Sequence, residues 1–376
     1  MVVTPEGRTE VVFGAYDTDV HWLDAAGGTE TLPPFSTGDI IKGSVTVDPD
    51  GFPIVYTGSR DNSFRALATD RTEPTELWAL SADVVDGTWN NDWDGNAVVR
   101  DDYLFLGGEN SWFFIVKLNR DYDGAGLVTV APEIVFSMPG YTQDLIAAIG
   151  DGNVSIESSV VLYEDRVYFT NSGGRVVGVD ISRLGQPGAD FPVVFDFWAG
   201  DDIDATPVVD ADGMLYLNVE LERFLDRAEE VGQIISLDPY TSGDPLRWSV
   251  AVPPGEGSEG KGGGWATPAL GDGVLYVPTM PGTFYAIDTA TGEELWSRFL
   301  GSHTWSSPVL VDDVLMVADC QGRIHAYDVS DPRVDPPDMW TFSLASAGCI
   351  ESTPAVWDGV LYVGSRDGGF YAIGDR

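Results

Sequence analysis

Residues 281–296 read Pro-Gly-Thr-Phe-Tyr-Ala-Ile-Asp-Thr-Ala-Thr-Gly-Glu-Glu-Leu-Trp, and weaker copies of this stretch recur along the chain. In most copies a turn precedes a short apolar strand that ends near an Asp, and a second turn leads to a strand that carries a Trp. The weaker copies centre on Trp22-Asp24, Ala66-Leu67, Val179-Asp180, Leu237-Asp238, Tyr327-Asp328 and Ala372-Ile373. Self-similarity at a spacing of roughly 40 to 60 residues indicates a repeat architecture.

Each copy contains four short predicted strands, named a to d in chain order. Turns such as Asp212-Gly213 and Asp272-Gly273 separate strand a from an apolar strand b, and Asp-Gly between apolar runs is a strong hairpin signal. Radially repeated sheets of four strands form a β-propeller. We count eight units, which predicts an all-β, eight-bladed β-propeller of four-stranded antiparallel blades. A seven-bladed propeller is the alternative, if the terminal units merge into one blade.

Residues 1–376 are predicted to form a single propeller domain whose first and last blades are incomplete. Val2 and Val3 are interpreted as the end of a clipped first strand, and the eighth unit ends before a strand d. The seam between these blades is therefore expected to expose a strand edge. We expect this edge to be filled either by residues absent from this chain or by strand complementation from another chain.

The pattern Ala286-x-Asp288-x-x-Thr291-Gly292-x-x-x-Trp296 resembles the tryptophan-docking repeat of the PQQ-like, quinoprotein-type β-propellers. The resemblance covers essentially the whole chain and is weakest in the third unit. It implies the fold more firmly than the function, because the family includes PQQ-dependent dehydrogenases as well as cofactor-free scaffolds similar to outer-membrane assembly lipoproteins. A large indole on an outer strand fills the gap against the next blade, and its N–H needs a partner there. We expect this packing role for Trp78, Trp248, Trp296 and Trp340.

The chain has a formal net charge of −40, from 60 acidic and 20 basic residues. Such a field repels phosphate backbones, which argues against nucleic acid as a partner. Cationic ligands, divalent metals or basic protein surfaces fit better. The simpler explanation is a well-solvated surface, as in a saline habitat. No apolar run is long enough to cross a bilayer, so no membrane span is predicted.

In a propeller the d-to-a and b-to-c loops share one face, here called the mouth face. Aligning the units places one residue of each d-to-a loop at the central channel, just before the Ser- and Thr-rich entry to strand a. These residues are Lys42, Asp94, Glu157, Asp204, Trp265, Trp305 and Glu351. Because carboxylates and indole faces both attract positive charge, the set predicts a site for a cation or a small cationic ligand. The alternative is that a chain with 60 acidic residues places some of them at any position.

Two stretches match the spacing of a calcium loop, in which oxygen ligands alternate ahead of a Gly turn. The first contains Asn90, Asp92 and Asp94, with Asp101 at the final ligand position. The second contains Asn119, Asp121 and Asp123, but a Val stands at its final ligand position. Calcium is therefore a candidate cofactor. For each stretch the alternative is an Asx-rich turn without a metal.

Cys320 and Cys349 are the only cysteines. The repeat places Cys320 in the b-to-c loop of the seventh unit and Cys349 in the d-to-a loop that enters the eighth, so both fall on the mouth face. A disulfide between them is predicted and would indicate an oxidising compartment, with two independent thiols as the alternative. Residues 1–20 carry no secretory signal. We expect an extracellular or periplasmic location, with the leader absent from this chain.

Two inserts extend the loops of the mouth face. Residues 137–153 form a long predicted loop, and residues 220–231 have helix-forming composition and spacing. Function tends to lie on loops that a rigid scaffold carries. Because no catalytic set is legible, the sequence favours a non-catalytic binding or scaffold propeller that holds a protein or a cationic or metal ligand on this face.

The alternative function, implied by the resemblance, is a PQQ- and calcium-dependent dehydrogenase. That chemistry uses a calcium ion held by acidic and amide side chains beside the quinone, with a Trp beneath it. Glu157, Asp204, Trp265 and Trp305 imitate parts of this arrangement. The short chain and the lack of a vicinal Cys-Cys pair argue against PQQ, as does the scarcity of basic residues other than Lys42 near the predicted channel.

Overall fold

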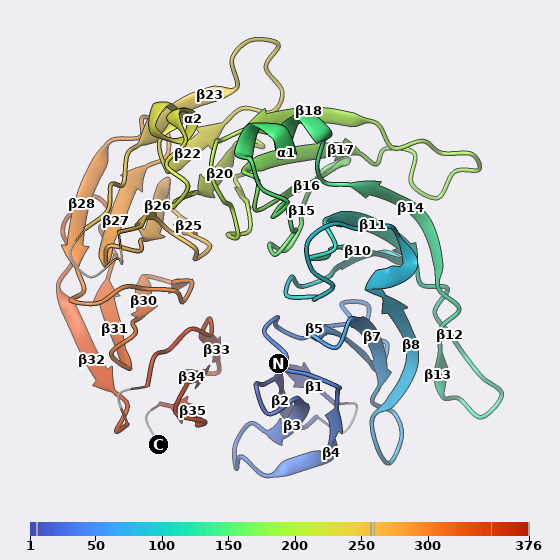
Figure 1. The fold of residues 1–376 in the computed structure, drawn as a ribbon. Helices are drawn as coiled ribbons and strands as arrows, with labels where there is room; N and C mark the ends of the chain where they lie inside the picture. Colours follow the sequence, from blue (N-terminus) through green and yellow to red (C-terminus); the bar gives the residue numbers. More distant parts are fainter. Residues whose placement is uncertain (5–6, 256–257, 259, 347, 375–376) are drawn as a thin grey trace. The chain divides into compact units, whose positions relative to one another are not determined.

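The computed structural model describes residues 1–4, 7–255, 258, 260–346 and 348–374. The chain forms two compact units, one of residues 1–173 with 179–194 and one of residues 174–178 with 195–376. Both units are built from small antiparallel sheets, which follow one another along the chain (Figure 1). Among the described residues, no helix is both long and apolar enough to cross a lipid bilayer.

In the described part of the first unit, three sheets have the strand orders β1-β2-β3-β4, β5-β6-β7-β8 and β14-β11-β10-β9. The strands of the first two sheets are β1 (Val2–Val3), β2 (Thr9–Gly14), β3 (Asp19–Asp24), β4 (Glu30–Ser36), β5 (Thr46–Val47), β6 (Ile54–Gly58), β7 (Ser63–Ala68) and β8 (Thr75–Ser81). A short 3-10 helix, η1 (Ala82–Val84), follows β8. The third sheet contains β9 (Val98–Arg100), β10 (Tyr103–Gly107), β11 (Trp112–Lys117) and β14 (Glu133–Pro139), and a hairpin of β12 (Asp121–Tyr122) and β13 (Val128–Thr129) interrupts it.

The next sheet along the chain has the order β15-β16-β17-β18. Its strands are β15 (Val161–Tyr163), β16 (Arg166–Thr170), β17 (Arg175–Asp180) and β18 (Val193–Trp198). Helix α1 (Gln143–Ile149) precedes it, inside the insert that the sequence predicts to be a loop. The Thr142 side chain caps α1 by accepting from the Leu145 N–H, and Gly150 ends it in the left-handed region at φ 68.

In the described part of the second unit, the sheets have the orders β19-β20-β22-β23, β25-β26-β27-β28, β29-β30-β31-β32 and β33-β34-β35. The first two contain β19 (Val208–Val209), β20 (Leu215–Asn218), β22 (Ile234–Leu237), β23 (Leu246–Val250), β25 (Ala269–Gly271), β26 (Val274–Pro278), β27 (Thr283–Asp288) and β28 (Glu294–Phe299). The last two contain β29 (Val309–Val311), β30 (Val314–Ala318), β31 (Arg323–Asp328), β32 (Asp338–Ser343), β33 (Ala355–Trp357), β34 (Val360–Gly364) and β35 (Phe370–Ile373).

These sheets make the fold class an eight-bladed β-propeller of four-stranded antiparallel blades, although β33-β34-β35 has three strands within the described residues. The prediction of eight blades is therefore confirmed over the seven-bladed alternative. That residues 1–376 form a single domain stays a prediction.

The quoted stretch shows why its residue types recur. In β27 Phe284 and Ala286 are buried, while Thr283 and Tyr285 are half-buried, as strand periodicity requires. Asp288 Oδ1 accepts from the backbone N–H groups of Ala290 and Thr291, which orders the following turn.

Gly292 completes that turn at φ 73, and a Cβ there would lie 2.7 Å from the Trp248 ring. The indole of Trp248 thus packs on the glycine of the next repeat and donates from Nε1 to the Thr289 carbonyl, at 2.7 Å. Trp296 donates in the same way to the Pro332 carbonyl, at 3.1 Å. Each of these indoles therefore reaches the following sheet, whereas Trp340 is 38% exposed.

The second insert differs from its prediction. Residues 220–231 are not one helix: Glu220–Leu221 forms the short strand β21, and only Asp226–Val231 forms helix α2. Strand β21 pairs with β24 (Gly262–Gly263). A backbone partner distant in sequence therefore overrides the local helical preference of Glu220 and Leu221.

Candidate functional site

Three of the predicted mouth residues lie together in the first unit. Asp94 Oδ2 accepts from Lys42 Nζ at 2.9 Å and from Arg60 Nη2 at 2.8 Å. Carboxylate oxygens of Asp94, Glu157 and Glu109 all lie within 4.8 Å of one another. We call Lys42, Arg60, Asp94, Glu109 and Glu157 the first acidic cluster.

Burial and charge act differently on these carboxyl groups. Glu109 is 3% exposed, and burial together with the neighbouring Glu157 and Asp94 carboxylates raises the pKa of Glu109 to about 9. Burial also raises the pKa of Glu157. For Asp94 burial acts in the same direction, but the bonds from Arg60 and Lys42 prevail and lower its pKa. At neutral pH the first acidic cluster thus combines an ionised Asp94, two cations and a protonated Glu109.

We expect the raised pKa of Glu109 to make stability depend on pH. The native state holds a proton on Glu109 that the unfolded chain releases above a pH of about 4.3, so this contribution to stability is present at low pH and is lost as the pH rises towards about 9. The slope reaches at most about 1.4 kcal/mol per pH unit for one proton. Urea unfolding of the wild type and Glu109→Gln between pH 5 and 9 should show a steeper fall for the wild type. Parallel pH profiles would show that Glu109 titrates normally.

The first calcium-like stretch enters the same network. Asn90 Nδ2 donates to Asp92 Oδ2 at 2.8 Å and to Glu109 Oε2 at 3.0 Å. Asp92 also lies 3.4 Å from the Arg60 guanidinium. Asp101, however, lies in the β9–β10 turn at φ 55, where its carbonyl oxygen accepts from Arg120. The structure therefore brings Asn90, Asp92 and Asp94 to one network and leaves Asp101 outside it.

The second calcium-like stretch forms the β12–β13 hairpin. Asp123 Oδ1 accepts from the N–H groups of Ala125 and Leu127 at 2.8 and 3.0 Å. Asn119 Nδ2 donates to the Ala131 carbonyl, and Asp121 is exposed in β12. Asp123 thus has the contacts of an Asx turn, which was the alternative reading of this stretch.

The remaining predicted mouth residues lie in the second unit. The rings of Trp265 and Trp305 stack with centroids 4.8 Å apart, and the His303 ring lies 4.7 Å from Trp305. Trp265 Nε1 donates to Glu220 Oε2. Asp204 forms a group with Asp202 and Glu220, in which carboxylate oxygens lie within 4.8 Å of one another. We call Asp202, Asp204 and Glu220 the second acidic cluster.

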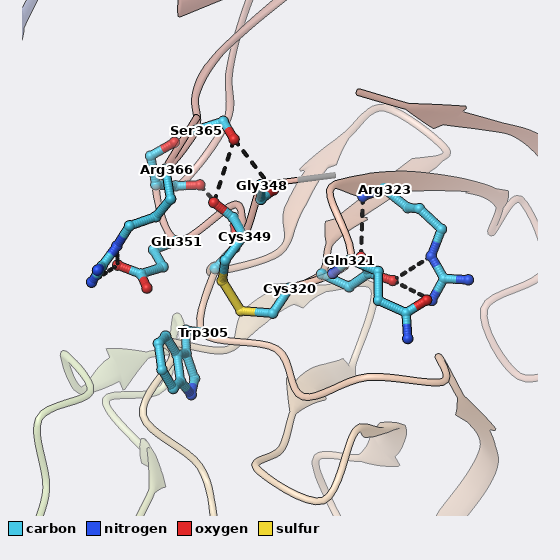
Figure 2. The surroundings of a disulfide bond; sticks show 12 residues. Trp305, Cys320, Gln321, Arg323, Gly348, Cys349, Glu351, Ser365 and Arg366 are labelled. Carbon is cyan, nitrogen blue, oxygen red and sulfur yellow. Dashed lines mark hydrogen bonds and ion pairs between the residues drawn. A yellow bond between two sulfur atoms is a disulfide. The ribbon is translucent and has the colours of Figure 1, made fainter. Parts of the chain in front are cut away.

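Glu351 and the two cysteines lie near one another. Glu351 pairs with Arg366 at 2.7 Å, and Cys320 and Cys349 are joined by a disulfide. The Arg366 N–H also donates to the Cys349 carbonyl, at 3.0 Å. Figure 2 shows the Glu351–Arg366 pair and the Trp305 ring around this disulfide.

Glu109 and Glu220 are two buried acids of these clusters that the alignment did not single out. Each stands two residues after a strand b, since β10 ends at Gly107 and β20 at Asn218. An acid directly after strand b, in the b-to-c loop of the mouth face, is the sequence signal that points to them.

The comparisons with known proteins agree with the repeat. Residues 230–374 match the family model described as outer membrane protein assembly factor BamB. The resemblance to the PQQ-like β-propeller repeats is confirmed. No curated protein matches the sequence.

Solved structures match this propeller over almost its full length. The crystal structure of BamB from Moraxella catarrhalis is 16% identical, with a TM-score of 0.64, over 99% of this chain and 95% of that chain. The computationally designed Ika8 protein is 13% identical, with a TM-score of 0.65, over 97% of this chain and 93% of that chain. At such identities the similarity shows the fold alone.

Proposed function

We propose that this protein is a non-catalytic propeller that binds protein partners in the periplasm or outside the cell. The observation that carries the proposal is the match of residues 230–374 to a family described as an outer membrane protein assembly factor. The Cys320–Cys349 disulfide supports an oxidising compartment.

A groove in the first unit offers a surface for such a partner. It has a volume of about 520 Å³ and runs between β8 and β14, the outermost strands of two consecutive sheets. Its lining residues are Trp78, Ala79, Leu80, Ser81, Asp83, Val84, Pro132 and Ile134. Val84 is 49% exposed and Ile134 is 37% exposed, so the groove presents apolar side chains to the solvent.

The shape and charge of the groove favour one kind of occupant. An outermost strand can pair with an extended peptide, and apolar pockets beside it select alternate side chains. The net charge of −40, with Asp83 in the lining, favours a peptide that carries basic residues. We therefore propose an extended segment of alternating apolar and basic residues as the ligand of this groove.

Peptide selection tests this proposal. A random peptide library panned on the immobilised protein should enrich alternating apolar and basic sequences. In fluorescence anisotropy, Ile134→Asp should weaken the enriched peptide at least 10-fold. Val194→Asp, at a valine that is 40% exposed on β18, is the matched control and should leave the affinity unchanged. No enrichment, or equal affinity for the wild type and Ile134→Asp, would contradict binding in the groove.

The dehydrogenase alternative has a direct test of its own. PQQ and calcium are added to the protein, and the absorbance of bound quinone and dye-linked alcohol oxidation are measured. We expect neither stoichiometric binding nor turnover. A quinone spectrum at one equivalent together with turnover would replace the scaffold proposal by an enzymatic one.

Strand complementation remains a proposal for the last sheet, of order β33-β34-β35 in the described residues. A strand added along β35 would give this sheet four strands, as in the preceding blades. Hydrogen exchange of Tyr371–Ile373 measures this directly: added strand peptides should slow exchange there, and unchanged exchange would count against complementation.

A further inference from the structure

The second acidic cluster lies where the chain enters and leaves β19 and β20. Asp202 is 5% exposed and Glu220 is 2% exposed, while Asp204 is half-buried. The Glu220 N–H donates to the Asp202 carbonyl at 2.9 Å, which fixes the two acids side by side. Three carboxyl groups thus lie close together where little of their surface is exposed to solvent.

One carboxylate oxygen of Glu220 is buried but accepts no hydrogen bond among the described residues. Its Oε2 accepts from Trp265 Nε1, but Oε1 is buried without a hydrogen-bond donor among the described residues. A buried carboxylate oxygen without a donor is costly, because it loses water and gains nothing in return. The buried oxygen of Glu220 without a donor therefore indicates a place that favours added positive charge.

Two basic side chains lie near the second acidic cluster, and one of them contacts a member of it. Lys261 Nζ pairs with Glu222, and Arg223 lies 3.4 Å from Asp201 and 3.6 Å from Asp202. Among the ion pairs of the described residues, none includes Glu220. In the first acidic cluster, by contrast, Arg60 and Lys42 both contact Asp94 directly. Asp94 therefore has two cationic partners at 2.8–2.9 Å, whereas Asp202 has one more distant cation and Glu220 has no ion pair among the described residues.

We propose that Asp202, Asp204 and Glu220 bind a hard divalent cation of the size of calcium. The carboxylate oxygens lie within 4.8 Å of one another, and calcium takes oxygen ligands at about 2.3–2.6 Å, so one ion can contact all three residues. Magnesium usually keeps several waters and is held by one or two carboxylates, so three carboxylates favour calcium. Water completes a coordination shell of six to eight oxygens.

The backbone around the second acidic cluster is held in place before any ion binds. Asp201 is fully buried, and its Oδ2 accepts from the N–H groups of Glu222 and Arg223 at 3.0 and 2.9 Å. Strand β21, which carries Glu220, pairs with the glycines of β24. Ligands on such a fixed framework lose little freedom on binding, which favours affinity.

Terbium luminescence and calcium competition test the site. Tb³⁺ occupies calcium sites and emits when a nearby indole is excited, and Trp265 contacts Glu220 directly. At 150 mM KCl we expect saturable emission at one Tb³⁺ per chain, displaced by Ca²⁺ more readily than by Mg²⁺. Trp265→Phe should lower the emission several-fold, while calorimetry still detects the ion.

Variants separate this site from general attraction to an acidic surface. Glu220→Gln should weaken Ca²⁺ at least 10-fold, whereas Glu109→Gln in the first acidic cluster should not change it. Glu220→Gln keeps the shape of the side chain and removes a buried carboxyl oxygen that lacks a donor, so its melting temperature without calcium should equal or exceed that of the wild type. Absence of saturable binding, or equal affinity for the wild type and Glu220→Gln, would overturn the proposal. Binding of peptides in the β8–β14 groove is measured separately, so either proposal can fail alone.

Discussion

Replacing Trp93 by alanine is expected to lower the free energy of unfolding by about 4 kcal/mol, within the range for a large aromatic removed from a packed core. Trp93 is fully buried, and its ring lies 6.0 Å from Phe64 and 5.8 Å from Phe114. A Cβ on Gly108 would lie 3.0 Å from this ring, so the surroundings leave no spare space. Loss of the indole leaves a cavity that these neighbours cannot fill.

Urea unfolding at constant pH measures this effect. Trp89 is the matched control, because it lies four residues earlier and is 57% exposed. We expect Trp89→Ala to change the free energy of unfolding by less than about 0.5 kcal/mol. Equal losses for the two variants would show that Trp93 does not anchor the core. Trp93 also separates Asp92 from Asp94, so Trp93→Ala should disturb the first acidic cluster and flatten the pH dependence assigned to Glu109.

Replacing Gly263 by alanine is expected to cost about 3 kcal/mol or more, from backbone strain and overpacking together. Gly263 has φ 64, a conformation that disfavours a side chain. A Cβ there would overlap the Val219 carbonyl oxygen and would lie 2.8 Å from the Glu220 Cα. Strand β21 must then shift, and Glu220 shifts with it.

The effect of Gly263→Ala has two readouts. Chemical unfolding gives the loss of stability, and calorimetry should show that Ca²⁺ binding weakens in the same variant. Gly260→Ala is the control, since Gly260 also has positive φ, 84, but its Cβ would meet no atom within 4 Å. This control should lose only about 1 kcal/mol, the cost of the conformation itself. If Gly260→Ala and Gly263→Ala behave alike, the close approach to Val219 is unimportant.

The blades were predictable because their signals are local. In the β25–β26 hairpin, Asp272 and Gly273 have φ 49 and 74, the pair of positive values that such a turn needs and that Asp-Gly supplies. Gly292 illustrates the same point, because its position in the repeat matches both its φ of 73 and the Trp248 ring packed against it. Turn residues and strand periodicity, which are read from short stretches of sequence, were thus enough to predict the fold.

The pairing of charges was not predictable, because it depends on contacts between distant residues. Alignment placed Asp94 and Asp204 at equivalent positions, but Arg60 reaches Asp94 while Glu220 accompanies Asp204. Asp101 fitted a calcium spacing, yet it lies in the turn of the β9–β10 hairpin, where its carbonyl oxygen accepts from Arg120. The sequence predicted a helix at Glu220. The structure shows a strand there because β21 pairs with the glycines of β24, which lie about 40 residues further along the chain.

Crystals soaked in terbium provide the most direct measurement of whether the two acidic clusters differ as proposed. An anomalous difference map should show one strong peak bounded by carboxylate oxygens of Asp202, Asp204 and Glu220. It should show none between Asp94, Glu109 and Glu157, where Arg60 and Lys42 already supply positive charge. A peak at the first acidic cluster with none at the second would contradict this assignment.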